Sequence, residues 1–308
     1  MIALALLLSW QVVYTEPHHP WLDLDHGTQF MDITATDARH AWAVGENQWG
    51  TDGHYSVLVR WNGYGWRRQS LPKKGAYLDL EKVDASRPDN VWVVGTDYEG
   101  GADGLLHYDG RRWRFLSLPL VHEAVALGGQ RAWAFTDKHA WLYDGAKRQR
   151  FDVPIEAHAA DALAENDIWA VGYTGGDHTQ PAAAHWDGRA WTAVPVPPAP
   201  GEDVNDLTTV LAVSPTEVWA AGSTDNGPLL YRWDGTRWAA AVLRTEPITS
   251  LIRHHDRIWA ADGKHLLRQT NQTGGRWLRN TPQRPITALA SGGGRVWALS
   301  GKRILSIR

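Results

Sequence analysis

The chain has 308 residues, of which 43% are hydrophobic and 21% are charged, a balance that is typical of globular rather than disordered proteins. Its formal net charge of -3 argues against a general nucleic-acid-binding protein, which needs a strongly basic surface. The chain contains no cysteine, so disulfides, thiolate metal ligands and a cysteine nucleophile are excluded.

The chain opens with an apolar run, residues 2–8, which is followed by Trp10 and by a proline at position 17. The run is too short to span a bilayer, and no Lys or Arg precedes Arg39, whereas a signal peptide begins with a positively charged segment. We therefore expect residues 1–17 to form a β-strand, with a signal peptide as the alternative. On this basis we expect a cytoplasmic protein, with secretion as the alternative.

A short motif of the type Trp-Ala-Val-Gly recurs along the rest of the chain, which explains the bias of 19 Trp against 4 Phe. The seven copies begin at Trp42, Trp92, Trp133, Trp169, Trp219, Trp259 and Trp297. They lie between 36 and 50 residues apart, which is the period of β-propeller blades. Within each motif the Trp and Val point to one side of the strand and the Ala to the other, so stacked blades would pair large with small side chains.

Most copies are followed by an Asn-Gly or Asp-Gly dipeptide and a further Trp, as in residues 108–113. Such a dipeptide between hydrophobic runs is a hairpin signal, because both of its residues tolerate the positive φ of a tight primed turn. A Leu-Pro or Val-Pro then ends the strand, since proline cannot donate to the ladder. Each unit is therefore expected to contain four strands.

These observations predict an all-β fold, a seven-bladed β-propeller with four-stranded blades that forms one domain over residues 1–308. The expected blades span approximately residues 31–72, 78–119, 121–154, 158–197, 207–243, 248–282 and 286–308. The seventh unit has no fourth strand of its own, whereas residues 1–17 provide a spare one. We therefore expect the N-terminal strand to pair into the last blade and close the ring, which removes its open edges.

The sequence "VWVVG" at 91–95 followed by "YDGRRW" at 108–113 resembles the repeats of kelch and Asp-box propellers, and above all bacterial repeat proteins with a "VWAVG…HWDGxxW" pattern. The resemblance covers residues 32–308 and implies a propeller, a fold that hosts unrelated activities. Copper-radical oxidases on this fold need a Tyr–Cys crosslink, which a chain without cysteine cannot form. Sialidases bind a carboxylate with three arginines, and the corresponding loops here hold little arginine, notably Arg244 and Arg284.

The resemblance also implies that the loops entering each blade and the loops between its second and third strands meet at one end of the central channel. Nine of the 14 histidines lie in these loops, namely His18, His19, His26, His54, His122, His139, His158, His178 and His265. Most of the Asp and Glu lie there too, while the turns of the opposite end carry much of the Arg. We therefore expect one acidic, His-rich end and one basic end.

Five carboxylates lie near the entry to the innermost strand of their blades, namely Asp32, Glu81, Glu123, Asp161 and Asp206. Converging carboxylates repel one another, which raises their pKa values or recruits a cation. Two pairs stand out by position, His122 with Glu123 and His158 with Asp161, and they would be the acid–base groups of an enzyme. Further ligand-binding candidates in these loops are Trp21, Trp49, Tyr77, Tyr98, Tyr173 and His178.

The first hypothesis is a binding propeller whose acidic, His-rich channel mouth recognises a small molecule, a glycan or a peptide. The alternative is a lyase, cyclase or hydrolase that uses the His/carboxylate pairs, with or without a divalent metal, at the same mouth. A third hypothesis is an assembly scaffold with a flat patch of exposed aromatic residues. No nucleic-acid partner and no membrane-spanning segment are expected.

Overall fold

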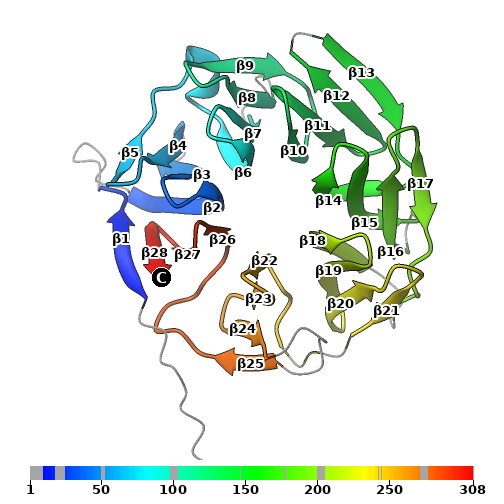
Figure 1. The fold of residues 1–308 in the computed structure, drawn as a ribbon. Helices are drawn as coiled ribbons and strands as arrows, with labels where there is room; N and C mark the ends of the chain where they lie inside the picture. The colour runs from blue at the N-terminus through cyan, green and yellow to red at the C-terminus, as the bar shows by residue number, and fades with distance from the viewer. Residues whose placement is uncertain are drawn as a thin grey trace, which may run out of the picture.

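A computed structural model describes residues 10–17, 25–49, 53–97, 103–145, 147–176, 178–199, 205–241, 243, 245–270 and 277–307. Within these ranges the chain forms seven four-stranded antiparallel sheets, arranged as blades around a central channel (Figure 1). Helical structure in the described residues is limited to one 3-10 turn, Lys73–Gly75. The predicted seven-bladed β-propeller is confirmed.

Within each of the first six blades the strands run outward from the channel in chain order (Figure 1). The first blade contains β2 (Asp25–Asp37), β3 (His40–Trp49), β4 (Gly53–Trp61) and β5 (Trp66–Arg68). The second blade contains β6 (Asp79–Arg87), β7 (Asn90–Thr96), β8 (Gly104–Tyr108) and β9 (Trp113–Ser117). The third blade contains β10 (Glu123–Leu127), β11 (Arg131–Thr136), β12 (His139–Asp144) and β13 (Lys147–Asp152).

The fourth blade contains β14 (Glu156–Ala164), β15 (Asp167–Thr174), β16 (Gln180–Trp186) and β17 (Trp191–Val194). The fifth blade contains β18 (Asn205–Ser214), β19 (Glu217–Thr224), β20 (Gly227–Trp233) and β21 (Trp238–Ala240). The sixth blade contains β22 (Ser250–His254), β23 (Arg257–Ala261), β24 (Leu266–Gln269) and β25 (Trp277–Asn280). The seventh blade contains β26 (Leu289–Gly292), β27 (Arg295–Ser300), β28 (Arg303–Ile307) and, as its outer strand, β1 (Gln11–Thr15).

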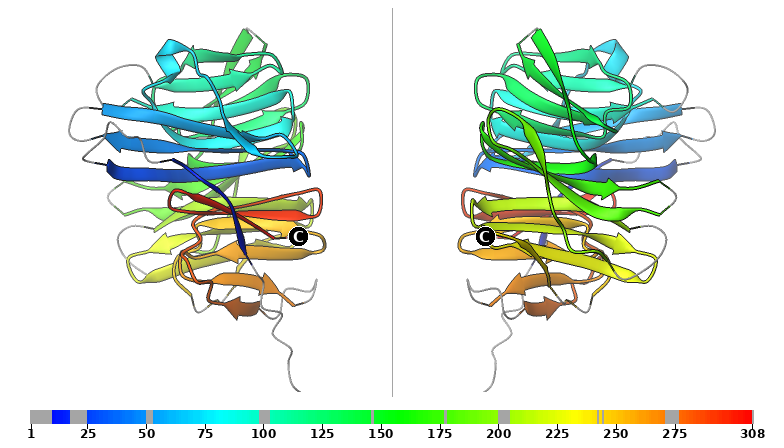
Figure 2. Two further views of the ribbon diagram at one scale, coloured as in Figure 1. Left: turned by 90° about the vertical axis from the view of Figure 1, so that its left-hand side faces the viewer. Right: turned by 90° about the vertical axis from the view of Figure 1, so that its right-hand side faces the viewer.

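The strands run between the two flat ends of the ring, where the loops and turns gather (Figure 2). We call one end the mouth end; in the third blade it carries residues 120–122 and 137–138. The other is the turn end, which in the same blade carries residues 128–130.

The first blade departs from the prediction: β3 and β4 pair as far as Trp49 and Gly53, so Trp49 lies in a strand rather than in a loop. No helical segment of the described residues has the length and apolarity of a membrane span.

The ring is closed by pairing the two terminal regions of the chain. β1 runs antiparallel to β28, with Gln11 opposite Ser306 and Thr15 opposite Arg303 (Figure 1). The backbone N–H of Glu16 extends this pairing by donating to the carbonyl oxygen of Lys302. The expectation that the N-terminal strand completes the last blade is therefore confirmed for Gln11–Thr15, while residues 1–9 of the expected strand lie outside the described part of the chain.

A polar clasp joins the closing strand to the first blade. Glu16 is only 2% exposed, and its Oε1 accepts a hydrogen bond from Arg68 Nη1 in β5 at 2.5 Å. Its Oε2 accepts another from the hydroxyl of Tyr14 at 2.7 Å, and burial together with this bond raises the pKa of Tyr14. Arg68 also donates to the carbonyl oxygen of Ser56 in β4. The clasp thus holds the seventh blade against the first.

Replacing Glu16 by Ala is expected to lower the free energy of unfolding by about 1–3 kcal/mol, because Arg68 and Tyr14 lose a largely buried charged partner. Chemical denaturation followed by tryptophan fluorescence measures this difference. Arg67→Ala is the control, since Arg67 is exposed in the same strand and should change stability by less than about 0.5 kcal/mol. Equal effects of the two substitutions would show that the clasp does not stabilise the closed ring.

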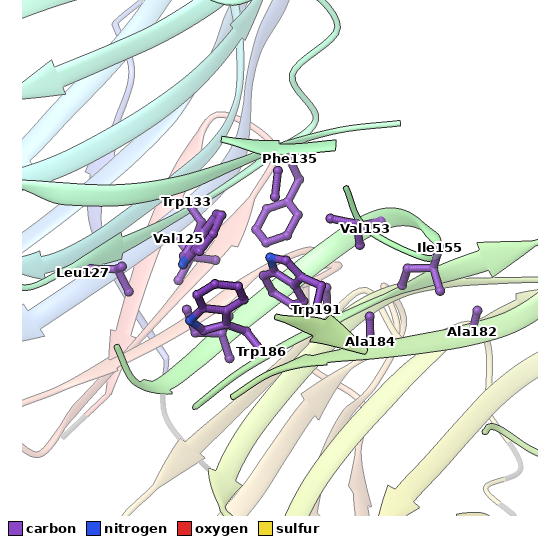
Figure 3. Close-up of a cluster of buried hydrophobic side chains, with 14 residues drawn as sticks. Val125, Leu127, Trp133, Phe135, Val153, Ile155, Ala182, Ala184, Trp186 and Trp191 are labelled. Carbon is purple, nitrogen blue, oxygen red and sulfur yellow. The ribbon is translucent and has the colours of Figure 1, made fainter. Parts of the chain in front are cut away.

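The core consists of hydrophobic layers between neighbouring blades. Trp42 and Val44 pack against the second blade, whereas Ala41 and Ala43 face the seventh, where they meet Trp297. The predicted pairing of large with small side chains is therefore correct. Figure 3 shows the corresponding layer between the third and fourth blades. The largest fully buried side chains include the motif residues Trp42, Trp92, Trp133, Trp219 and Trp297.

The Asp-Gly turns differ from the prediction of tight primed turns. In the Asp-Gly turn of the second blade, Gly110 has a positive φ, of 88°, and Asp109 does not. Asp109 instead accepts, at Oδ1, the backbone N–H groups of Arg111 at 3.0 Å and Arg112 at 2.9 Å. Its own N–H donates to the carbonyl oxygen of Arg112, which closes a longer turn. Asp is therefore selected here as a side-chain acceptor for the turn backbone.

Candidate functional site

A β-bulge on the innermost strand positions side chains at the mouth end. In the fourth blade the pairing of β14 with β15 shifts between Ala157 and Ala159, which leaves His158 as the extra residue. The motif glycine Gly172 lies opposite, and a Cβ atom there would come within 1.9 Å of the carbonyl oxygen of Glu156. Only glycine therefore permits this close approach of the two strands. Bulges re-aim side chains, which brings His158 to the channel mouth.

Two histidines at the mouth end are each held by a carboxylate. His158 Nδ1 lies 2.6 Å from Oδ2 of Asp206, which is on β18 of the next blade. His122, just before β10, has its Nε2 2.7 Å from Oδ1 of Asp137, in the turn after β11. The two imidazole centroids are 6.0 Å apart, and about a third of each side chain is exposed. The rings are therefore oriented in advance and accessible to a ligand.

Tyr173 adds a phenol to the two histidines. Its ring lies edge-on to His158 at a centroid distance of 5.2 Å, and its hydroxyl donates to Oε2 of Glu156 at 2.6 Å. Lys138 Nζ lies 3.5 Å from Oε1 of the same Glu156. We call this group the mouth cluster; its members are His122, Asp137, Lys138, Glu156, His158, Tyr173 and Asp206.

The mouth cluster controls the protonation of its own members. The hydrogen bond to Asp206 raises the pKa of His158, which favours the protonated ring. The hydrogen bond to Glu156 raises the pKa of Tyr173 to about 12, so its hydroxyl keeps its proton at neutral pH. The cluster therefore presents both proton donors and carboxylate acceptors within a small region formed by three blades.

Beneath the mouth, a cavity of about 490 Å³ is lined by the innermost strands of all seven blades. Its charged lining residues come from the first four blades and are Asp32, Glu81, Lys82, Asp84, Glu123 and Asp161. The last three blades contribute hydroxyl groups instead, from Thr209, Thr249, Ser250 and Thr287. The channel wall is therefore charged on one side and neutral on the other.

The aspartates of this wall connect one blade to the next. Asp161 Oδ1 accepts the N–H of Ala162, and its Oδ2 accepts the N–H of Ala212 on β18, both at 2.8 Å. Asp84 bridges in the same way to the N–H of Ala126 on β10, and Asp32 bridges to the N–H of Val83 on β6. Both oxygens of each aspartate are thus used by the backbone, which assigns these residues a structural role.

Burial against the channel wall raises the pKa values of these carboxyls, to about 6 for Asp84 and to about 7 for both Glu123 and Asp161. Burial raises the pKa of Asp32 as well. Lys82 Nζ lies 3.7 Å from Oε2 of Glu123, and this charge raises the pKa of Lys82. The main cause of the raised carboxyl pKa values is thus loss of water, and mutual repulsion is secondary.

The structure corrects both predicted His/carboxylate pairings. His122 pairs with Asp137 rather than Glu123, since Glu123 lines the channel cavity, where its Oε2 lies 3.7 Å from Lys82 Nζ. His158 pairs with Asp206 of the next blade, while Asp161 is occupied by backbone N–H groups. Of the five carboxylates expected to converge, Asp32, Glu81, Glu123 and Asp161 line the cavity and Asp206 belongs to the mouth cluster.

The other predicted site residues are dispersed. Tyr77 is 56% exposed, and its ring centroid lies 5.5 Å from that of Tyr55. His178 lies in the loop between β15 and β16. Residues outside the described part of the chain are Trp21, Tyr98 and Arg244, and the side chain of Trp49 is not described either. Arg284 lies between β25 and β26.

The sequence analysis did not identify Lys82, Asp84, Asp137 and Glu156. Two of them could have been found by aligning the innermost strands on the motif tryptophan. Asp84 precedes Trp92 by the same number of residues as Asp161 precedes Trp169. Lys82 likewise precedes Trp92 by the same number of residues as Glu123 precedes Trp133. No group of three or more His, Asp or Glu that could hold a metal ion occurs among the described residues. The divalent metal that the sequence analysis allowed for an enzyme stays an untested alternative.

Fold and site together define a seven-bladed β-propeller with a His/Tyr/carboxylate cluster at one mouth of its channel. No protein-family model matches the sequence, and no curated protein matches it. The kelch and Asp-box resemblance therefore stays a resemblance of motifs.

Solved structures show the same fold. The chain is similar to YCF48 from Cyanidioschyzon merolae, with 16% identity, a TM-score of 0.66, and coverage of 97% of this chain and 99% of that one. It is also similar to the extracellular domain of a putative hybrid two-component system from B. thetaiotaomicron (13% identity, TM-score 0.68, 97% of this chain and 39% of that one). A third similar structure is the GH74 xyloglucanase from Xanthomonas campestris, with 13% identity, a TM-score of 0.66, and coverage of 97% of this chain and 53% of that one. At these identities the similarity shows the fold alone.

Proposed function

We propose that the mouth cluster binds a small, hydroxyl-rich ligand such as the end of a glycan. The observation that carries this proposal is the pair of partly exposed imidazoles, His122 and His158, each oriented by its own carboxylate. A sugar hydroxyl both donates and accepts hydrogen bonds. The cluster offers matching donors from histidine and lysine, and acceptors from its carboxylates and the hydroxyl oxygen of Tyr173.

The oriented rings also favour binding on energetic grounds. Side chains already fixed by hydrogen bonds of 2.6–2.7 Å lose little rotamer freedom when a ligand binds. One structural neighbour is named as a xyloglucanase, which acts on a glycan, although at 13% identity that similarity carries only the fold. The proposal therefore rests on the cluster itself.

Calorimetric titration of the full chain with a panel of neutral mono- and disaccharides tests the proposal. His158→Gln is expected to weaken saccharide binding by about tenfold, the value of one charge-assisted hydrogen bond. His185→Gln is the matched control, because His185 Nε2 lies 2.8 Å from Oδ1 of Asp167 at the turn end. Saccharide binding by the His185→Gln variant should be unchanged. Absence of saturable binding by every sugar, or equal losses in both variants, would contradict a glycan site at the mouth.

The second candidate is an acid–base enzyme at the same cluster. The specific observation in its favour is the raised pKa of His158, which suits a proton donor beside a second oriented imidazole. In such an enzyme His158 would protonate the substrate and His122, oriented by Asp137, would accept a proton. Turnover of a bound saccharide that is lost in His122→Gln, with binding retained, would favour the enzyme over the binding protein.

A further inference from the structure

A second cavity lies at the turn end, on the opposite side of the ring from the mouth cluster. Its volume is about 740 Å³, and it is formed by the second blade together with Gln130 and Gly145 of the third. Three arginines of the second blade, Arg111, Arg112 and Arg114, line it. It therefore combines a strongly basic wall with space for a small molecule.

Among the described residues of this lining, the one carboxylate, Asp109, is already occupied. Its Oδ1 accepts the backbone N–H groups of Arg111 and Arg112, and its Oδ2 forms an ion pair of 2.8 Å with Arg114 Nη2. In the part of the chain that the structure describes, no carboxylate pairs with the guanidinium groups of Arg111 and Arg112. Three arginines and one aspartate leave two positive charges in excess on the cavity wall.

The fourth lining group that could carry a positive charge, His107, is neutral. Its ring stacks on Trp92 at 4.1 Å, and its Nε2 lies 3.0 Å from Oδ1 of Asn90. Burial lowers the pKa of His107 to about 4, so the ring is uncharged at neutral pH and adds no positive charge that would attract an anion away from the arginines. Leu116 supplies an apolar part of the wall.

The turn itself does not need these arginines. The fourth blade has the same turn, in which Asp187 Oδ1 accepts the N–H groups of Arg189 at 2.8 Å and Ala190 at 3.0 Å. At the positions of Arg112 and Arg114, however, this blade has Ala190 and Thr192. Because the local backbone forms equally well with a single arginine, the cluster of three calls for an explanation beyond folding.

We propose that this cavity binds a phosphorylated small molecule, with its phosphoryl group held by Arg111, Arg112 and Arg114. The planar guanidinium matches the spacing of phosphate oxygens and donates two hydrogen bonds at once. A phosphate monoester carries nearly two negative charges at neutral pH, which the excess charge of the wall balances. The cavity is larger than a phosphate group, so it also holds the body of the ligand.

Calorimetric titration of the full chain with adenosine monophosphate, inorganic phosphate and adenosine tests this site. Saturable binding of the two phosphates, and none of adenosine, is expected. The double variant Arg111→Gln, Arg112→Gln should weaken the binding of adenosine monophosphate by at least about tenfold. Arg189→Gln, which removes one arginine from the equivalent turn of the fourth blade, should leave it unchanged.

The proposal would be overturned by no saturation with either phosphate at millimolar concentration, or by an equal loss of affinity in the Arg189→Gln control. Binding of adenosine as tightly as its monophosphate would also refute it, because the phosphoryl group would then contribute nothing. His158→Gln should not affect this binding, since the mouth cluster lies at the other end. Failure of this site and failure of the glycan site are therefore distinguishable.

Discussion

Unfolding experiments at a series of pH values are expected to show that the protein is more stable near pH 5 than near pH 8. The cause is the group of channel carboxyls whose pKa values are raised by burial, with Asp84 at about 6 and Glu123 and Asp161 at about 7. In the unfolded chain these groups have pKa values of about 4. Between pH 4 and pH 7 the folded state therefore binds more protons than the unfolded state, and stability falls as the pH rises.

The expected loss is about 2–4 kcal/mol for the set. A pKa that is raised from about 4 to about 7, as for Asp161, corresponds to about 4 kcal/mol for a single isolated group, and water in the open channel reduces this. His158, whose pKa is raised by Asp206, acts in the same direction, because its stabilisation is present at low pH and is lost as the pH rises through its folded pKa. Turn carboxyls such as Asp234, with a pKa lowered to about 2, act only below about pH 4.

Thermal unfolding midpoints measured from pH 4.5 to pH 8 check this prediction. The triple variant Asp84→Asn, Glu123→Gln, Asp161→Asn should lose most of the pH dependence, whatever its absolute stability. Asp234→Asn, which removes an exposed turn carboxyl, should keep the slope of the wild type. An unchanged slope in the triple variant would mean that other groups cause the pH dependence.

Replacing Trp133 by Ala is expected to lower the free energy of unfolding by about 3–5 kcal/mol, the usual cost of removing a buried aromatic side chain. Trp133 is 1% exposed and packs between the third and fourth blades (Figure 3). Its ring centroid lies 5.0 Å from those of both Phe151 and Trp186, and 5.6 Å from that of Trp191. The substitution leaves a cavity bordered by rigid rings, which cannot collapse to fill it.

Denaturant titration of the variant gives the free energy directly, and circular dichroism checks that the sheet is retained. Trp133→Phe should cost less, because most of the contact area remains. Tyr64→Ala, at a residue that is 92% exposed, should change stability by less than about 0.5 kcal/mol. A loss for Trp133→Ala as small as that of the Tyr64 control would show that the blade interface does not depend on the motif tryptophan.

The fold could be predicted because its determinants are local and repeated. The seven tryptophan motifs set the number of blades, and the strand missing after Trp297 pointed to closure by the N-terminal strand. The turns were located correctly but their geometry was not, since Asp109 acts as a side-chain acceptor. The type of turn depends on the hydrogen bonds that the Asp side chain accepts from individual N–H groups, and the Asp-Gly dipeptide alone does not distinguish between these turn types.

The composition of the mouth was foreseen only in part. Loop position identified His122, His158 and Tyr173 as candidates, but their partners Asp137 and Glu156 were not recognised. The same limit applies to the channel, where raised carboxyl pKa values were expected for a reason, mutual repulsion, that proved secondary to burial.

By itself, the sequence determined the class of fold and the order of the strands, because these follow from local periodicity. Only the tertiary structure decided which side chains meet. His158 and Asp206 are 48 residues apart and come into contact because one lies on a bulge and the other on the adjoining blade. Asp161 likewise became a bridge because the N–H of Ala212 lies opposite it across the blade boundary. Such contacts depend on how neighbouring blades are set against each other, which no stretch within one repeat encodes.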